Sequence, residues 1–125
     1  MKKLVLSIFI LLVSNSVLAA SPTCHSSHGG YCAYAGKVSR IYINTSNIIL
    51  IYFEEPISVE DAAVAGITIS HGNAAAFHVP NNPDFARMFY STALAAQASG
   101  RNISMQMRGE QSGYLQFDRI WLADK

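Results

Sequence analysis

Two cysteines enclose two histidines near the start of the chain, and these residue types could support three kinds of chemistry. The cluster consists of Cys24, His25, His28 and Cys32. Its spacing matches neither a zinc motif nor the Cys-x-x-Cys pair of thiol redox centres, although it could in principle hold a metal ion. Two thiols in an oxidising compartment normally pair. The sequence therefore predicts a Cys24–Cys32 disulfide that ties down residues 21–35 and no bound metal.

The residues that could do acid–base chemistry are scattered. An isolated histidine such as His71 or His78 is usually a surface or hydrogen-bonded residue. Glu54 and Glu55 are adjacent, and adjacent strand residues point to opposite faces, whereas paired glycosidase carboxylates face each other about 5 to 9 Å apart. No Gly-x-Ser-x-Gly, His-Glu-x-x-His or glycine-rich phosphate loop is present in the sequence. We expect a protein that is not an enzyme and has no cofactor.

The first twenty residues have the form of a signal peptide. Lys2 and Lys3 make a positive start, residues 4–13 are almost entirely apolar, and Ala19 and Ala20 supply small residues for cleavage. The apolar run is shorter than the roughly 20 residues that a membrane helix requires. We expect a signal peptide over 1–20 and a secreted or periplasmic protein without a membrane span.

The remainder of the chain suits one small domain. From Ser21 onward, seven basic and eight acidic residues give a formal charge of −1. Nucleic-acid-binding domains instead carry a basic face or stripe, so nucleic acid is not an expected partner. A length of about 105 residues fits a single domain, which we expect over 21–125.

Residue patterns predict the strands that would position these side chains. Residues 37–44 alternate polar and apolar at their start and are rich in β-branched residues, and residues 48–53 form a second strand that Pro56 ends. The short turn between them makes the two strands antiparallel. The same reasoning predicts a helical turn at 61–65 and short strands at 67–70, 75–79, 101–108 and 115–122, the last with a β-bulge near Asp118 and Arg119.

One helix has well-marked ends in the sequence. Asn82 is a suitable N-cap, Pro83 fits the first helical position and Gly100 supplies the stop, which predicts a helix over 83–99. The stripe expected to face the sheet recurs at three- and four-residue steps and comprises Phe85, Met88, Phe89, Thr92, Ala95, Ala96 and Ser99. Tyr90 and Leu94 lie on a second flank that a neighbouring subunit could cover.

This order of elements predicts the fold class. It is mainly β with one helix, α+β by content, and matches the five-stranded OB-fold, a Greek-key barrel with its helix between strands 3 and 4. An open antiparallel sheet covered by the helix is the alternative.

Two stretches resemble a known family. Phe89-Tyr90-Ser91-Thr92-Ala93-Leu94, followed by Ser99-Gly100-Arg101-Asn102-Ile103-Ser104-Met105, resembles the helix and next strand of the B subunits of subtilase cytotoxin and pertussis-like (typhoid-type) toxins. Tyr34-Ala35-Gly36-Lys37-Val38 resembles the start of their first strand. The resemblance implies an OB-fold protein that forms a ring pentamer and binds cell-surface glycans, often sialylated, for an enzymatic A subunit.

The resemblance also implies a glycan site and shows where this chain departs from the family. The candidate residues are Tyr34, Ala35, Met107 and Arg108, with Tyr34 stacking on a sugar and Arg108 pairing with a carboxylate. The sialoglycan-binding members have a serine where this chain has Ala35, and an aromatic residue where it has Met107. Loss of that hydroxyl removes a hydrogen bond worth about 1 kcal/mol, so we expect a changed glycan preference or none.

The sequence therefore favours an exported, non-catalytic glycan-binding protein that forms a homo-oligomer, with weak sites acting together. Its expected partners are a cell-surface glycan and an enzymatic A subunit. The alternative is a stand-alone exported OB-fold protein that binds a protein or small molecule without any A subunit.

Overall fold

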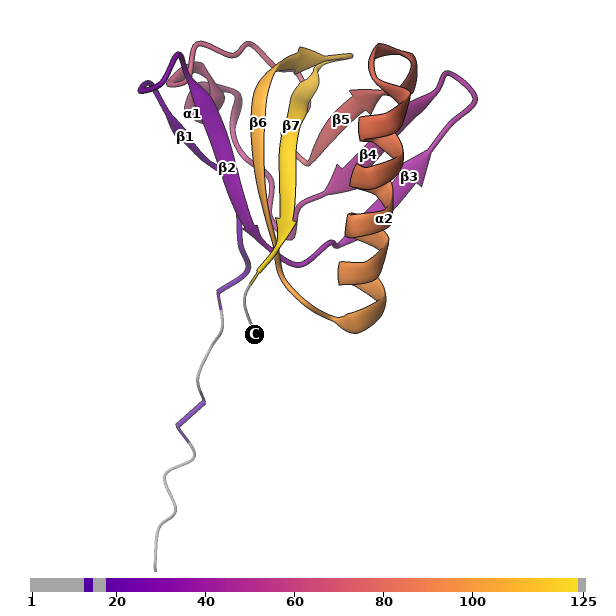
Figure 1. Cartoon of the computed structure of the whole chain (residues 1–125). Coiled ribbons are helices and arrows are strands. Elements are labelled where there is room, and N and C mark those ends of the chain that lie inside the picture. The colour runs from indigo at the N-terminus through magenta and orange to yellow at the C-terminus, as the bar shows by residue number, and fades with distance from the viewer. Residues whose placement is uncertain (1–12, 15–17, 124–125) are drawn as a thin grey trace, which may run out of the picture.

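The computed structural model describes residues 13–14 and 18–123 of the chain (Figure 1). Most of the predicted signal peptide lies outside these residues and stays a prediction. In the described part of the chain, no helix is both long and apolar enough to cross a membrane.

The described residues form one mixed β-sheet with two α-helices. The strands are β1 Thr23–His25, β2 Tyr31–Gly36, β3 Arg40–Ile43, β4 Ile48–Tyr52, β5 Ala74–His78, β6 Ile103–Gln111 and β7 Tyr114–Leu122. The helices are α1 Val59–Ala63 and α2 Pro83–Ser99, with a short 3₁₀ turn, η1, at Val79–Asn81. The sheet order is β1-β2-β6-β7-β5-β4-β3, and only the β5–β7 pair is parallel.

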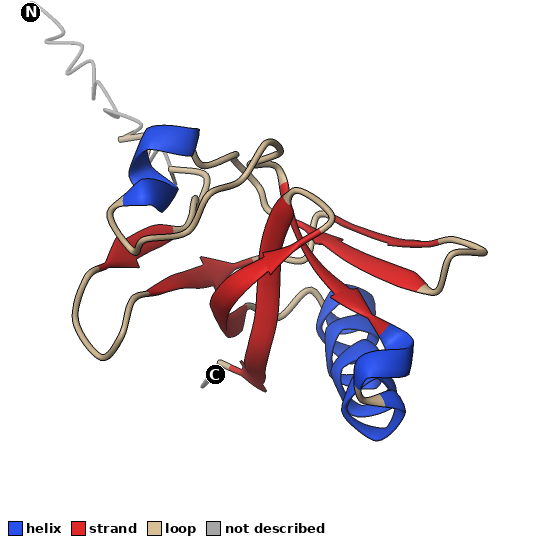
Figure 2. Cartoon of the chain, turned by 90° about the horizontal axis from the view of Figure 1, so that it is seen from above, coloured by secondary structure: helices blue, strands red, loops and turns tan. Residues whose placement is uncertain are grey.

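The two helices lie at opposite ends of a strongly curled sheet. Figure 1 shows α2 along one side, near β3 and β4, while α1 lies beside β1 on the other side. Seen from above in Figure 2, the helices remain far apart and the sheet runs between them. α2 covers one face of the sheet. In the described residues, the opposite face of β2 and β6 has no helix over it.

The predicted class is correct, but the predicted five-stranded barrel is not confirmed. The described residues form a sheet of seven strands, and α2 follows β5 rather than a third strand. β2 is missing from the prediction because its sequence, Tyr-Cys-Ala-Tyr-Ala-Gly, has no β-branched residue, the usual mark of a strand. Residues 67–70, predicted as a strand, form a loop whose two isoleucines are buried.

The predicted helix is confirmed with both of its ends. The Asn82 side chain accepts a hydrogen bond from the Phe85 backbone N–H at 3.1 Å. Gly100 has a φ of 66°, a left-handed conformation that favours glycine, and its N–H bonds to the carbonyls at the end of the helix. Local capping chemistry is therefore enough to set this element.

The stripe predicted to face the sheet is partly wrong. The buried residues of α2 are Ala86, Phe89, Ala93 and Ala96, whereas Met88 is 63% exposed. Phe89 stacks on Phe117 of β7 with ring centroids 3.6 Å apart. The alanines around Phe89 let the helix approach the sheet closely, so the small residues, not the larger Met88, face inward.

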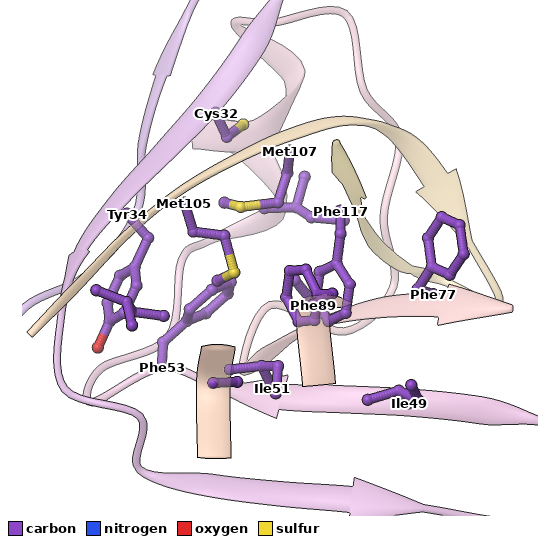
Figure 3. Packing of buried hydrophobic residues seen from close by; sticks show 14 of the residues in the cluster. Cys32, Tyr34, Ile49, Ile51, Phe53, Phe77, Phe89, Met105, Met107 and Phe117 are labelled. Carbon is purple, nitrogen blue, oxygen red and sulfur yellow. The ribbon is translucent and has the colours of Figure 1, made fainter. Parts of the chain in front are cut away.

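The core lies between α2 and the inner face of the sheet (Figure 3). Phe89, Phe117 and Phe77 make one aromatic group, and Tyr34 meets Phe53 with ring centroids 4.9 Å apart. Figure 3 shows methionines of β6 filling the space between these groups. Every buried residue of β2 and β6 therefore belongs to one face of its strand, and the alternate residues face outward.

The predicted bulge and disulfide are both confirmed. Gln106 pairs with Arg119 and Met107 with Phe117, so Asp118 is the extra residue of a bulge on β7. Cys24 and Cys32 lie opposite each other on β1 and β2 and form a disulfide across the pair. The disulfide closes a hairpin whose turn carries a positive φ at His28, Gly29 and Gly30.

Candidate functional site

Three neighbouring strands present alternate side chains on the face turned away from the core. Ala35 of β2 lies opposite Ser104 of β6, and Ser104 lies opposite Trp121 of β7. A second row one step along the ladder joins Ala33, Gln106 and Arg119. Small residues on β2 and larger ones on β7 thus make a trough across the strands.

This trough is a groove of about 390 Å³ that ends in a second hollow of about 250 Å³. The two share Tyr31 and Gln106, and we call them together the strand-face groove. Thr23, Ala33, Ala35, Ser104 and Trp121 line the larger part, and His28, Arg108 and Arg119 line the smaller part. One end is therefore aromatic and hydroxyl-bearing, and the other is cationic.

Two of the four predicted site residues lie in the core instead of at the surface. Tyr34 is 1% exposed and Met107 is 0% exposed, and Figure 3 shows both side chains inside the core. They point inward because the strand alternation that exposes Ala35 and Arg108 buries their neighbours. The prediction that Tyr34 stacks on a sugar is wrong, because its ring has no free face.

Tyr34 instead has a structural role. Its hydroxyl donates a hydrogen bond to the Lys37 carbonyl at 2.6 Å and accepts one from the Glu54 N–H at 3.1 Å. Burial raises the pKa of Tyr34 to about 12. The side chain ties the end of β2 to the segment that follows β4, directly beneath the groove.

Arg108 is at the groove, as predicted, but its guanidinium is already engaged. Its Nη1 donates to the carbonyls of His28 and Gly30 at 2.7 and 3.3 Å, and its Nε lies 3.7 Å from an oxygen of Asp118. The guanidinium also lies over the Tyr31 ring, 5.3 Å from its centroid. Arg108 therefore anchors the disulfide-closed turn as well as adding positive charge.

Two further groove residues, Trp121 and Arg119, are not among the predicted site residues. Trp121 is 45% exposed at one end, and the Arg119 side chain is 56% exposed at the other. Arg119 faces the groove only because the bulge at Asp118 shifts the register of β7 by one residue. In the sequence, the break in apolar alternation at Asp118 could have indicated that Arg119 faces outward. The position of Trp121 follows only from the pairing of β6 with β7, in which Trp121 lies opposite Ser104.

The other residues considered for chemistry do not gather at one place. Glu54 accepts hydrogen bonds from the backbone N–H groups of Ala20 and Lys37. The His71 ring lies 4.9 Å from Tyr114, and His78 bonds to Asn81. Both cysteines are in the disulfide, so neither is a thiolate. Within the described residues, no group of three or more histidine, cysteine or acidic side chains could hold a metal ion.

Comparisons with known proteins add no assignment. No family model, no curated protein and no solved structure matches the chain. The case for a function therefore depends on the side chains of the groove.

Proposed function

We propose that this is an exported, non-catalytic glycan-binding protein and that the strand-face groove holds the sugar. The observation that carries the proposal is the groove's composition: Trp121 and Tyr31 border a floor of small and hydroxyl-bearing residues. Aromatic rings offer an apolar face for a sugar ring, while hydroxyl and amide side chains meet its hydroxyl groups. Ser104 and Gln106 supply such groups between the two aromatic residues.

Ser104 supplies the hydroxyl that Ala35 lacks. It is the cross-strand partner of Ala35, so its side chain leaves the same face of the sheet one strand away. Related toxin subunits would carry this hydroxyl on the first strand, and here it lies on the neighbouring one. A glycan would therefore bind with a shifted orientation, and this supports a changed preference over a lost site.

The cationic end of the groove favours an acidic glycan. Arg108 and Arg119 both lie beside the single carboxylate of Asp118, which leaves an excess of one positive charge. Arg119 keeps part of its guanidinium free because only its Nε donates to Asp118, at 2.8 Å. A sugar carboxylate could accept the remaining N–H donors, the strongest kind of hydrogen bond available to it.

The strand connectivity supports a relationship to the OB-fold. β2 and β3 lie at opposite ends of the six-strand order that runs from β2 to β3, yet only residues 37–39 separate them in the chain. The Ser39 N–H donates to the Tyr52 carbonyl at 3.2 Å and so extends the β3–β4 ladder toward β2. If the short β1 is set aside and β2 and β3 are taken as the two halves of one bent strand, five strands remain with the helix after the third, the OB-fold arrangement.

Assembly into a homo-oligomer completes the proposal. A single groove would bind weakly, but several copies engaging one cell surface raise the overall affinity. Exposed apolar residues lie on both flanks of the buried stripe of α2, Met88 on one and Leu94 on the other, and offer contacts for neighbouring copies. An enzymatic A subunit would distinguish a toxin-like assembly from the alternative of a stand-alone protein that binds a protein or small molecule.

An array of acidic and neutral glycans, probed with the native protein, tests this function. We expect the native protein to bind sialylated or other carboxylate-bearing glycans. Trp121→Ala and Arg119→Ala should each weaken this binding at least tenfold, because one stacking or charged contact is worth about 1.4 kcal/mol or more. Ala35→Ser should change which glycans are bound. Val59→Ala is the control because Val59 is comparably exposed, at 43%, but lies on α1 and lines no part of the groove. The proposal is wrong if the array shows no binding, or if Trp121→Ala binds as the native protein does.

A further inference from the structure

A separate hollow, distinct from both parts of the strand-face groove, lies at the β3 end of the sheet. It measures about 540 Å³, within the roughly 300 to 1,000 Å³ range of small-molecule sites. The β3–β4 hairpin and the turn between β6 and β7 border it. Its rim residues are Tyr42, Asn44, Ser46, Tyr52, Ser112 and Tyr114, and we call it the tyrosine hollow.

The floor of the tyrosine hollow is a separate buried cluster on the outer face of the sheet. Ile48 and Leu50 of β4 and Ala74 and Ala76 of β5 are buried there, although the main core lies on the other face. Tyr52 and Tyr114 pack against these four residues. Alanine has no bulk beyond its Cβ, so the two tyrosine rings can lie low over the strands and form flat walls.

Both tyrosine rings are held before any ligand arrives. The Arg40 guanidinium lies over the Tyr52 ring, 3.9 Å from its centroid. The His71 ring lies 4.9 Å from that of Tyr114. Rings fixed in this way lose little conformational entropy on binding, and preorganisation of this kind favours affinity.

The polar groups around the tyrosine hollow are neutral and oriented. The Asn44 Oδ1 accepts hydrogen bonds from the backbone N–H groups of Ser46 at 3.0 Å and Ile48 at 3.2 Å. Because the oxygen is turned to the backbone, the Asn44 amide nitrogen points away from the turn with two donors. Ser112, whose φ is 54°, accepts from the Gln111 side chain at 3.0 Å and keeps its own hydroxyl proton to donate.

We propose that the tyrosine hollow is a second binding site, specific for an uncharged saccharide. The Tyr42 ring, 45% exposed at the rim, offers a face to a sugar ring, and the neutral hydroxyl and amide groups suit sugar hydroxyls. None of the residues lining it is charged, and the Arg40 guanidinium beside it is already placed over the Tyr52 ring. A nucleic-acid strand would require a row of cations along its backbone, and this hollow does not provide one.

The proposal is independent of the function proposed for the strand-face groove, because the two sites share no lining residue. The single tryptophan of the chain, Trp121, makes them separable by experiment. A sugar in the strand-face groove changes the Trp121 fluorescence, whereas a sugar in the tyrosine hollow leaves it unchanged.

The test is a nuclear magnetic resonance titration of the mature protein with methyl glycosides of glucose, galactose, mannose and N-acetylglucosamine. We expect at least one of them to shift the backbone amide signals of Tyr42, Asn44 and Ser112 without changing Trp121 fluorescence. Tyr42→Ala should weaken this binding about tenfold or more, because it removes one exposed ring from the rim. Trp121→Ala is the control and should bind these glycosides as the native protein does.

A conservative variant guards against a merely structural explanation. Asn44→Asp keeps the oxygen that accepts from Ser46 and Ile48 but removes the amide donors, so it should retain the fold and lose most of the binding. Three results overturn the proposal: no shift with any glycoside, shifts confined to residues of the strand-face groove, or unchanged affinity in both Tyr42→Ala and Asn44→Asp.

Discussion

At the scale of single residues, Tyr34 shows how the groove is supported from beneath. Its hydroxyl connects the carbonyl of Lys37 to the N–H of Glu54, and its ring packs on Phe53. A tyrosine near a glycine-rich loop is an obvious candidate for sugar stacking when only the sequence is considered. The choice between stacking and burial depends on which face of the strand it occupies, and only the pairing of β2 with β6 decides that.

Tyr34 should make the protein lose stability at high pH. Its pKa is raised from 10.0 to about 12 by burial, so the folded state holds the phenol proton more tightly than the unfolded chain does. The stabilisation linked to this proton is complete below pH 10 and is lost as the pH rises from 10 toward 12. Urea unfolding at a series of alkaline pH values measures the slope.

Tyr34→Phe is the matched variant for that measurement. It keeps the ring and removes the ionisable hydroxyl, so it should cost about 1 kcal/mol at neutral pH and flatten the decline between pH 10 and 12. An equally steep decline in the variant would show that Tyr34 is not its source.

At the scale of elements, the sequence predicted those segments whose signals are local. The α2 helix has its cap, its first-position proline and its terminal glycine within the segment itself, and β4 is a continuous apolar run. β2 depends on a partner far along the chain, because β6 flanks it and its own residues include no β-branched side chain. The groove could not be predicted for the same reason, since Ala35, Ser104 and Trp121 meet only through strand pairing.

The loop between α1 and β5 should depend strongly on Gly72 for its position. A Cβ added there would lie 1.8 Å from the carbonyl oxygen of Ile57, whose N–H donates to the Gly72 carbonyl at 2.9 Å. Backbone cannot yield as a flexible side chain can, so we expect Gly72→Ala to destabilise the fold by about 3 kcal/mol. Thermal unfolding of the purified variant gives the value.

Gly66→Ala is the control for Gly72→Ala. Gly66 has a φ of 74° and nothing within 4 Å of an added Cβ, so only its left-handed backbone is penalised, by about 1 kcal/mol. Equal losses in the two variants would mean that the contact with Ile57 relaxes freely.

At the scale of the whole molecule, assembly should depend on the uncovered side of α2. Met88 is 63% exposed and lies outside the buried stripe, so Met88→Asp should leave the monomer folded and shift the native mass toward one chain. Native mass spectrometry at micromolar concentration reads this directly, and circular dichroism checks the fold.

Val64→Asp serves as the control for assembly, because Val64 is comparably exposed at 55% but follows α1 at the other end of the sheet. It should assemble as the native protein does. A native mass of one chain for the unmodified protein would contradict the oligomer proposal altogether.

The disulfide also determines what the sheet presents to other chains. β1 is an edge strand of only three residues, and a covalent bond holds it against β2. Short edge strands give little length for another chain to pair with, and a fixed β1 occupies the hydrogen-bonding edge of β2 from Tyr31 to Ala33. Before the cysteines oxidise, that edge is covered by backbone pairing alone and is open to exchange. Oxidation thus closes a route to misassembly, and the proposed homo-oligomer would depend on this protection.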